Sequence, residues 1–174
     1  AGPLTASINL FDDTTVTTTL HRSAGPADSV VWTGAVAGRP RTSVLLVAQS
    51  GYVFGNVHLG DAGEYTLHDN GDGTLTVRQV DPASIPSETD PVPARETADG
   101  GAGRAVIPRS GDTAFDVMIL WSQEVLDDHF ADEAMGRAWA ASRIAELNTI
   151  LEDSLIAAGA RLAYAGTADY DDGF

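Results

Sequence analysis

A proline- and glycine-rich stretch near the middle of the chain most constrains how this chain can fold. Residues 81–112, DPASIPSETDPVPARETADGGAGRAVIPRSGD, contain five of the eight prolines and almost no large apolar side chains. Proline lacks the backbone N–H that strands and helix interiors use, so the stretch predicts an exposed, extended connector that a protease could cut easily. We therefore expect two folded parts, residues 1–80 and residues 113–174, joined by this linker.

The first part is expected to form short antiparallel strands. Val, Thr, Leu, Tyr and Trp dominate its apolar runs, several of which alternate with polar residues at period two, and glycine, proline and aspartate separate the runs. This spacing predicts an all-β antiparallel domain, either a sandwich or an open barrel. The expected strands are SINLF, TVTTTLHR, SVVWTGAV, TSVLLVA, YVFGNVHL, EYTLH and TLTVRQV.

The second part has a different periodicity. FDVMILWS, residues 115–122, lacks strict alternation, which is typical of a parallel strand covered on both faces. A helix follows, for which Asp132 is a suitable N-cap and Gly159 a suitable C′ residue, and ARLAYAGTADY is expected to form another strand. The predicted helical stripe consists of Met135, Trp139, Ile144, Leu147, Leu151, Leu155 and Ala158.

Strand, helix and strand together predict a βαβ unit, and one such unit cannot bury both faces of its sheet. Residues 113–174 are therefore expected to be the opening part of a larger α/β domain, in a chain of α+β class.

Charge and composition disfavour several classes of function. The formal net charge is -15, the chain has no lysine, and its acidic surface would repel phosphate backbones and anionic lipids. We therefore expect no nucleic-acid or membrane partner. The absence of cysteine excludes disulfides and thiolate zinc sites within these residues. No apolar run approaches the roughly eighteen residues that a membrane-spanning helix needs.

Few residues in the sequence are candidates for metal binding or acid–base catalysis. His58, Asp61, Glu64 and His68 lie close together in the sequence and could converge on zinc, but solvent-facing positions on two strands are the favoured interpretation, because convergence would depend on the strand register. His21 and His129 lack partners at helical or strand spacing, so both are expected on the surface.

One motif-like sequence is discounted, and two common catalytic motifs do not occur. Residues 69–73, DNGDG, lack the ligand spacing of a calcium loop and predict a hairpin turn instead. No Gly-x-Ser-x-Gly or H-E-x-x-H sequence occurs. The chain by itself thus carries no recognisable catalytic constellation.

A family resemblance extends over nearly the whole chain. The order INLFDDTTVTTTLHR, VVWTGAVAG, TSVLLVAQSGYVFGNVHL and EYTLHDNGDGTLTVRQVDPASIP resembles the propeptide of secreted bacterial zinc metallopeptidases of the metzincin clan, particularly the peptidyl-Asp metalloendopeptidase type. FDVMILWS and RIAELNTILEDSLIAAGARLAYAGTADY resemble the first strand, helix and second strand of that family's catalytic domain. Residues that match its pattern are Asn148, Ser154, Ile156, Arg161, Leu162 and Tyr170.

The resemblance implies a different function for each of three segments of the chain. Residues 1–80 would keep a secreted protease latent and assist its folding, residues 81–112 would be the activation linker, and residues 113–174 would begin the catalytic domain. The family's zinc helix, H-E-x-x-H-x-x-G-x-x-H, and its methionine turn lie further along than these residues reach. The chain alone is therefore expected to be inactive, with zinc and peptide substrate belonging to the full-length parent and the downstream catalytic domain as its partner.

The resemblance also implies two kinds of site residue. A propeptide can silence a zinc protease by offering the metal a ligand in place of water, and Asp61, at a glycine-flanked tip, is the first candidate with His58 the second. An ordinary turn aspartate is the alternative for Asp61. Asp116 lies where related reprolysins help to hold a structural calcium ion, and an edge-facing polar residue is the alternative there.

Two other functions stay open. The first part could be a non-enzymatic extracellular β-sandwich module, for adhesion or carbohydrate binding, joined to an unrelated α/β piece. The 174 residues could also act alone as an inhibitor of the mature protease.

Overall fold

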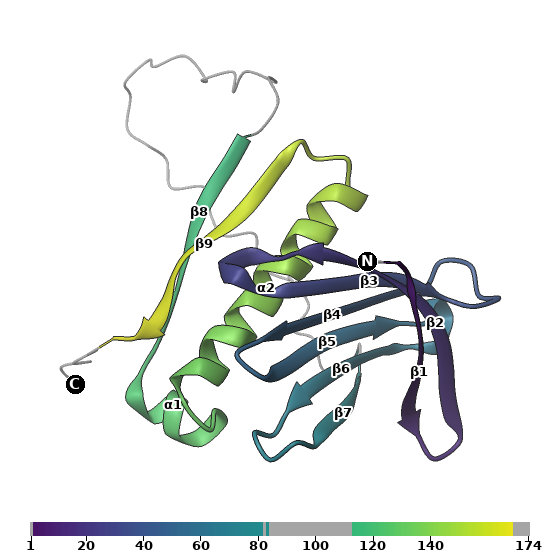
Figure 1. Ribbon diagram of the computed structural model, residues 1–174, viewed down its shortest axis with the longest axis horizontal. Coiled ribbons are helices and arrows are strands. Elements are labelled where there is room, and N and C mark those ends of the chain that lie inside the picture. The colour runs from purple at the N-terminus through teal and green to yellow at the C-terminus, as the bar shows by residue number, and fades with distance from the viewer. Residues whose placement is uncertain (1, 82, 84–112, 169–174) are drawn as a thin grey trace.

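The computed structural model describes residues 2–81, 83 and 113–168. Within them, seven strands form one antiparallel sheet, two strands form a parallel sheet, and helix α2 lies between the two sheets (Figure 1). The predicted connector lies almost entirely outside the described residues, so its conformation stays a prediction.

The predicted antiparallel β domain is confirmed. Its strands pair in sequence order as a meander, and the described strands are β1 (Leu4–Phe11), β2 (Thr14–Ala24), β3 (Val30–Val36), β4 (Ser43–Gln49), β5 (Tyr52–His58), β6 (Glu64–Asp69) and β7 (Leu75–Val80). Short 3-10 turns follow β2 and β5, at η1 (Pro26–Asp28) and η2 (Gly60–Ala62).

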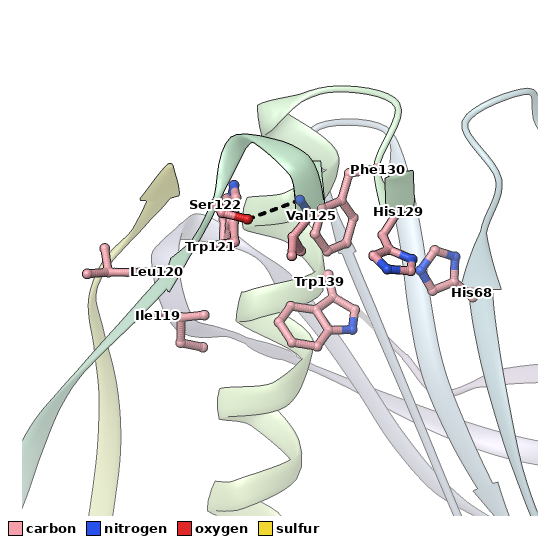
Figure 2. Close-up of a pocket in the computed structure, with 9 residues that line it drawn as sticks. All are labelled: His68, Ile119, Leu120, Trp121, Ser122, Val125, His129, Phe130 and Trp139. Atoms are coloured by element: carbon pink, nitrogen blue, oxygen red, sulfur yellow. Dashed lines mark hydrogen bonds between the residues drawn. The ribbon is translucent and has the colours of Figure 1, made fainter. Parts of the chain in front are cut away.

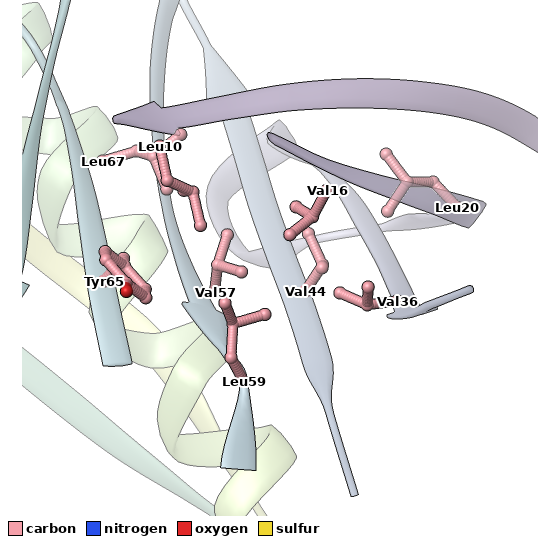
Figure 3. Packing of buried hydrophobic residues seen from close by; sticks show 9 residues of the cluster. All are labelled: Leu10, Val16, Leu20, Val36, Val44, Val57, Leu59, Tyr65 and Leu67. Atoms are coloured by element: carbon pink, nitrogen blue, oxygen red, sulfur yellow. The ribbon is translucent and has the colours of Figure 1, made fainter. Parts of the chain in front are cut away.

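The meander is a single open, curled sheet. The ring of Phe11 on β1 lies 5.8 Å from that of Tyr65 on β6, although four strands separate β1 from β6 in the sheet. Only a curled sheet brings these strands together, so of the two predicted architectures the open barrel is the closer one. The concave face holds a hydrophobic cluster made of Leu10, Val16, Leu20, Val36, Val44, Val57, Leu59, Tyr65 and Leu67 (Figure 3).

Alternation along the strands gives the sheet a second apolar face. On β4, Val44 belongs to the concave cluster, whereas the neighbouring Leu45 and Val47 pack on the opposite face against Ala141 and Ala145 of helix α2. Successive side chains of a strand point to opposite faces, and both faces of this meander are therefore buried in its central strands.

The predicted strand, helix and strand are also present. The elements are β8 (Thr113–Trp121), α1 (Gln123–His129), α2 (Glu133–Asp153) and β9 (Ala158–Thr167), with β8 and β9 parallel. Helix α1 is an additional element that the sequence analysis did not predict. The N-cap prediction is confirmed, because the Asp132 side chain accepts a hydrogen bond from the Met135 backbone N–H.

Helix α2 is buried on two sides, so the single predicted stripe was incomplete. Its Ala140 contacts Trp121 and Ala165 in one cluster, and its Ala141 contacts the β4 face in another. Small side chains allow a helix to approach two sheets closely, which explains why the most buried positions include residues without a long apolar side chain. The buried residues are Met135, Gly136, Ala138, Ala140, Ala141, Ser142, Ile144 and Ala145.

The predicted end of α2 was wrong. The helix ends at Asp153, Leu155 adopts the left-handed conformation with φ of 56°, and Gly159 lies inside β9. The Ile156 N–H bonds to the Leu151 carbonyl and the Leu155 N–H to the Glu152 carbonyl, which is the Schellman pattern. Leu155 is therefore the C′ residue and is 92% exposed, not part of the buried stripe.

Candidate functional site

A cleft of about 490 Å³ lies where the parallel sheet, both helices and the meander meet (Figure 2). It opens beside the carboxyl end of β8, a common position for ligand sites in α/β layers. The lining residues are His68, Ile119, Leu120, Trp121, Ser122, Val125, His129, Phe130 and Trp139.

Three aromatic rings form the wall of this cleft. The Phe130 ring centroid lies 5.8 Å from those of both Trp121 and Trp139, in tilted contacts. Gly136 makes room for the indole of Trp121, because a Cβ at this position would lie 2.8 Å from the ring. The Trp121 Nε1 is buried and has no hydrogen-bond partner within the described residues.

The cleft is held in place by contacts between the chain's two parts. The Tyr52 hydroxyl on β5 donates to the Asp132 carboxylate at 2.8 Å, and Gly71 of the β6–β7 turn lies against Ala131. The Met135 N–H and this hydroxyl lower the pKa of Asp132, and the bond to Asp132 raises the pKa of Tyr52. The segment after α1 is thus fixed against the end of β6.

The structure does not bring the four predicted zinc candidates together. No group of three or more potential metal-ligating side chains gathers among the described residues. His58 lies opposite Glu64 in the β5–β6 ladder, whereas His68 lies near the other end of β6. The prediction that these side chains face solvent is confirmed for His58, which is exposed, whereas His68 is half-buried in the cleft.

The two latency candidates lie at the far end of the meander from the helix contacts. His58 ends β5 and Asp61 lies in η2, and both are exposed. The connection that contains Asp61 and the β6–β7 turn lie at opposite ends of β6, and only the latter touches the start of α2. The described residues therefore leave the Asp61 carboxylate free to face a partner.

Asp116 forms an ion pair across the parallel sheet. Its carboxylate accepts two hydrogen bonds from the Arg161 guanidinium, at 2.6 Å and 3.0 Å, from the directly opposite position on β9. These bonds lower the pKa of Asp116, and both side chains are more than half exposed. A calcium ion at this position would have to compete with Arg161.

The turn prediction for residues 69–73 is supported by local bonds. The carboxylate of Asp69 accepts from the N–H groups of Val53 and Gly71, and that of Asp72 accepts from both the N–H and the hydroxyl of Thr74. Three of these four bonds lie within the β6–β7 hairpin and the fourth ties the turn to β5, so the predicted turn role is met.

Sequence reasoning missed the cleft itself. Its residues come from β6, β8, α1 and α2, and no short motif joins them. His129 was expected on the surface without a partner, and it does end α1 in an exposed position, yet the fold brings it to the same cleft as His68. The only sequence signal for the cleft was the recurrence of three aromatic residues, Trp121, Phe130 and Trp139, at intervals of nine.

Comparisons with known proteins identify no relative: the chain matches no protein-family model, no curated protein and no solved structure. Among the described residues, no helix combines the length and apolar composition that crossing a membrane requires.

Proposed function

We propose that this chain is the propeptide region of a secreted zinc metalloendopeptidase together with the first βαβ unit of its peptidase domain. In this proposal residues 1–80 keep the protease latent and assist its folding, and residues 81–112 are cut on activation. Proteolysis itself belongs to a downstream zinc helix in the parent protein.

The observation that carries the proposal is the uncovered outer face of the β8–β9 sheet. Met118 is 64% exposed, and Leu120 and Tyr164 are each 48% exposed on this face. Parallel sheets are normally covered on both faces, and among the described residues α2 covers only one. An α/β domain that continues beyond this unit would supply the missing layer.

The packing of α2 supports a role in folding. Val47 of the meander is 1% exposed and Ala141 of the helix is fully buried against the same cluster. Without residues 1–80, this apolar side of α2 would face water, because the β8–β9 sheet covers only the other side. The meander would therefore act as a template for helix α2 of the protease.

The position of Asp61 is compatible with latency. The side chain is exposed in a glycine-flanked turn, and neither an ion pair nor a hydrogen bond engages it within the described residues. A carboxylate is a suitable zinc ligand and could replace the water that the metal would activate. His58, exposed at the end of β5, is the second candidate.

The first test is the coding sequence downstream of Phe174. The proposal expects an H-E-x-x-H-x-x-G-x-x-H sequence within about a hundred residues, roughly the size of the missing part of one domain. Its absence would favour the alternative, an extracellular binding or adhesion module, for which the aromatic cleft would be the place to look for a ligand.

The second test is kinetic and uses the full zymogen. Asp61→Ala is expected to release peptidase activity before cleavage, whereas Asp12→Ala, which removes another exposed turn aspartate, should leave latency intact. Unchanged latency in the Asp61 variant would remove this residue from the mechanism, and parallel assays of His58→Ala would decide the second candidate.

A further inference from the structure

We propose that His68 and His129 form a binding site for a divalent transition-metal ion at the mouth of the aromatic cleft. The site joins β6 of the meander to α1 of the βαβ unit. It is separate from the zinc helix of the proposed parent protease, and it does not depend on the protease assignment.

Backbone packing brings the two histidines together. Gly71 lies against Ala131, three residues after His68 and two after His129, so the two chain segments run past one another. The Phe54 ring meets His68 edge-on at 4.9 Å, and Phe130, the residue after His129, packs in the same cluster as Phe54. Both histidines line the cleft, and Figure 2 shows a ring nitrogen of each directed toward the other.

Both imidazoles are available to a metal. Neither side chain makes a hydrogen bond or an ion pair within the described residues. Neutral imidazole is a preferred ligand of zinc, copper and nickel, with Zn–N distances of about 2.0–2.1 Å. The net charge of -15 favours cations over anions at the surface of the chain in general.

The site would be open rather than closed. Two imidazoles fill two positions of a tetrahedral ion, and the remaining positions would face water or a ligand in the cleft. The walls on that side are Trp121, Phe130 and Trp139, so an apolar molecule with one oxygen or nitrogen donor is the ligand class that suits both metal and cleft.

The test is metal titration of the 174-residue chain, with affinity measured by competition against a chromophoric chelator. We expect one equivalent of Zn²⁺, Ni²⁺ or Cu²⁺ to bind, with Cu²⁺ tightest, and Mg²⁺ not to compete, because it prefers oxygen ligands. Bound metal should raise the melting temperature, since only the folded state brings the two imidazoles together and therefore binds the ion more tightly than the unfolded chain does.

The chain contains four histidines, so every imidazole can be tested. His68→Ala and His129→Gln should each weaken binding at least as much as the roughly 10–100-fold that loss of an outer-shell partner costs. His21→Ala and His58→Ala are matched controls that should bind as the native chain does. The exposed His129 can change without disturbing the core, which keeps the test valid even if His68→Ala fails to fold.

Absence of stoichiometric binding would overturn the site. Unchanged affinity in His129→Gln would do the same, as would a loss of binding in the His58 control. Because these measurements involve no peptidase assay, their outcome is independent of whether the parent protein is a protease.

Discussion

The end of helix α2 provides a sharp test of the fold, through the substitution Leu155→Gly. Leu155 is the C′ residue of a Schellman motif and has a φ of 56°. Glycine is strongly preferred at this position because it has no Cβ to clash in the left-handed conformation. We therefore expect the substitution to stabilise the protein, although it replaces a large apolar residue.

The magnitude follows from two opposing terms. Left-handed backbone costs an L-residue about 1–2 kcal/mol, and glycine loses about 0.5–1 kcal/mol more backbone entropy on folding. The lost side chain contributes little, because Leu155 is 92% exposed. The net stabilisation is about 0.5–1 kcal/mol, which for a chain of this size raises the melting temperature by roughly 1–4 °C.

The assay compares thermal and urea unfolding of the native chain, Leu155→Gly and Leu155→Ala by far-UV circular dichroism. Leu155→Ala is the matched control, since it removes the same side chain but keeps the strained backbone, and it should stay within about 0.5 kcal/mol of the native chain. A glycine variant no more stable than the alanine variant would refute the C′ assignment. Such a result would favour the longer helix, with Gly159 as its C′ residue, that the sequence predicted.

Two further substitutions test the hydrogen bonds that fix α2 to its neighbours. Asn148→Ala should destabilise the protein by about 1–3 kcal/mol, because its amide bonds both the N–H and the carbonyl of Ala160, and urea unfolding should show the loss. An unchanged midpoint would mean that the helix is not tied to β9 there. Asp132 has a lowered pKa, so its contribution to stability is present above about pH 4 and is lost as the pH falls through the folded-state pKa. Asp132→Asn keeps an N-cap side chain but removes the titrating carboxyl group. Its urea midpoint should therefore fall less at acidic pH than that of the native chain, and identical pH profiles would contradict the role given to the Tyr52 and Met135 contacts.

Local features of the chain were predictable because they depend on neighbouring residues. Period-two alternation predicted the seven strands, the DNGDG sequence predicted its hairpin turn, and Asp132 predicted the start of α2. The end of α2 was not predictable in the same way. No glycine occupies its C′ position, and an exposed leucine takes the left-handed conformation that glycine usually marks.

The candidate site residues also differ in how much of their role depends on the fold. Asp61 and His58 were latency candidates that the family resemblance implied, and the structure places them in an exposed turn and at an exposed strand end, with their role still a prediction. The pairing of Asp116 with Arg161 could not be read from the sequence, because 45 residues separate them and only the β8–β9 register sets them opposite one another.

The sequence by itself determined the strands that the structure describes and the start of α2, but not helix α1 or the end of α2. The division of the chain at the proline-rich stretch stays a prediction. Only the tertiary structure decided that α2 would be buried from two sides. The reason is that Ala140 and Ala141 give a weak signal in any hydrophobic pattern, yet their small size lets two sheets approach the helix. The same packing brings His68 and His129 from separate elements into one cleft. In the proposed site the two imidazoles would bind one metal ion together.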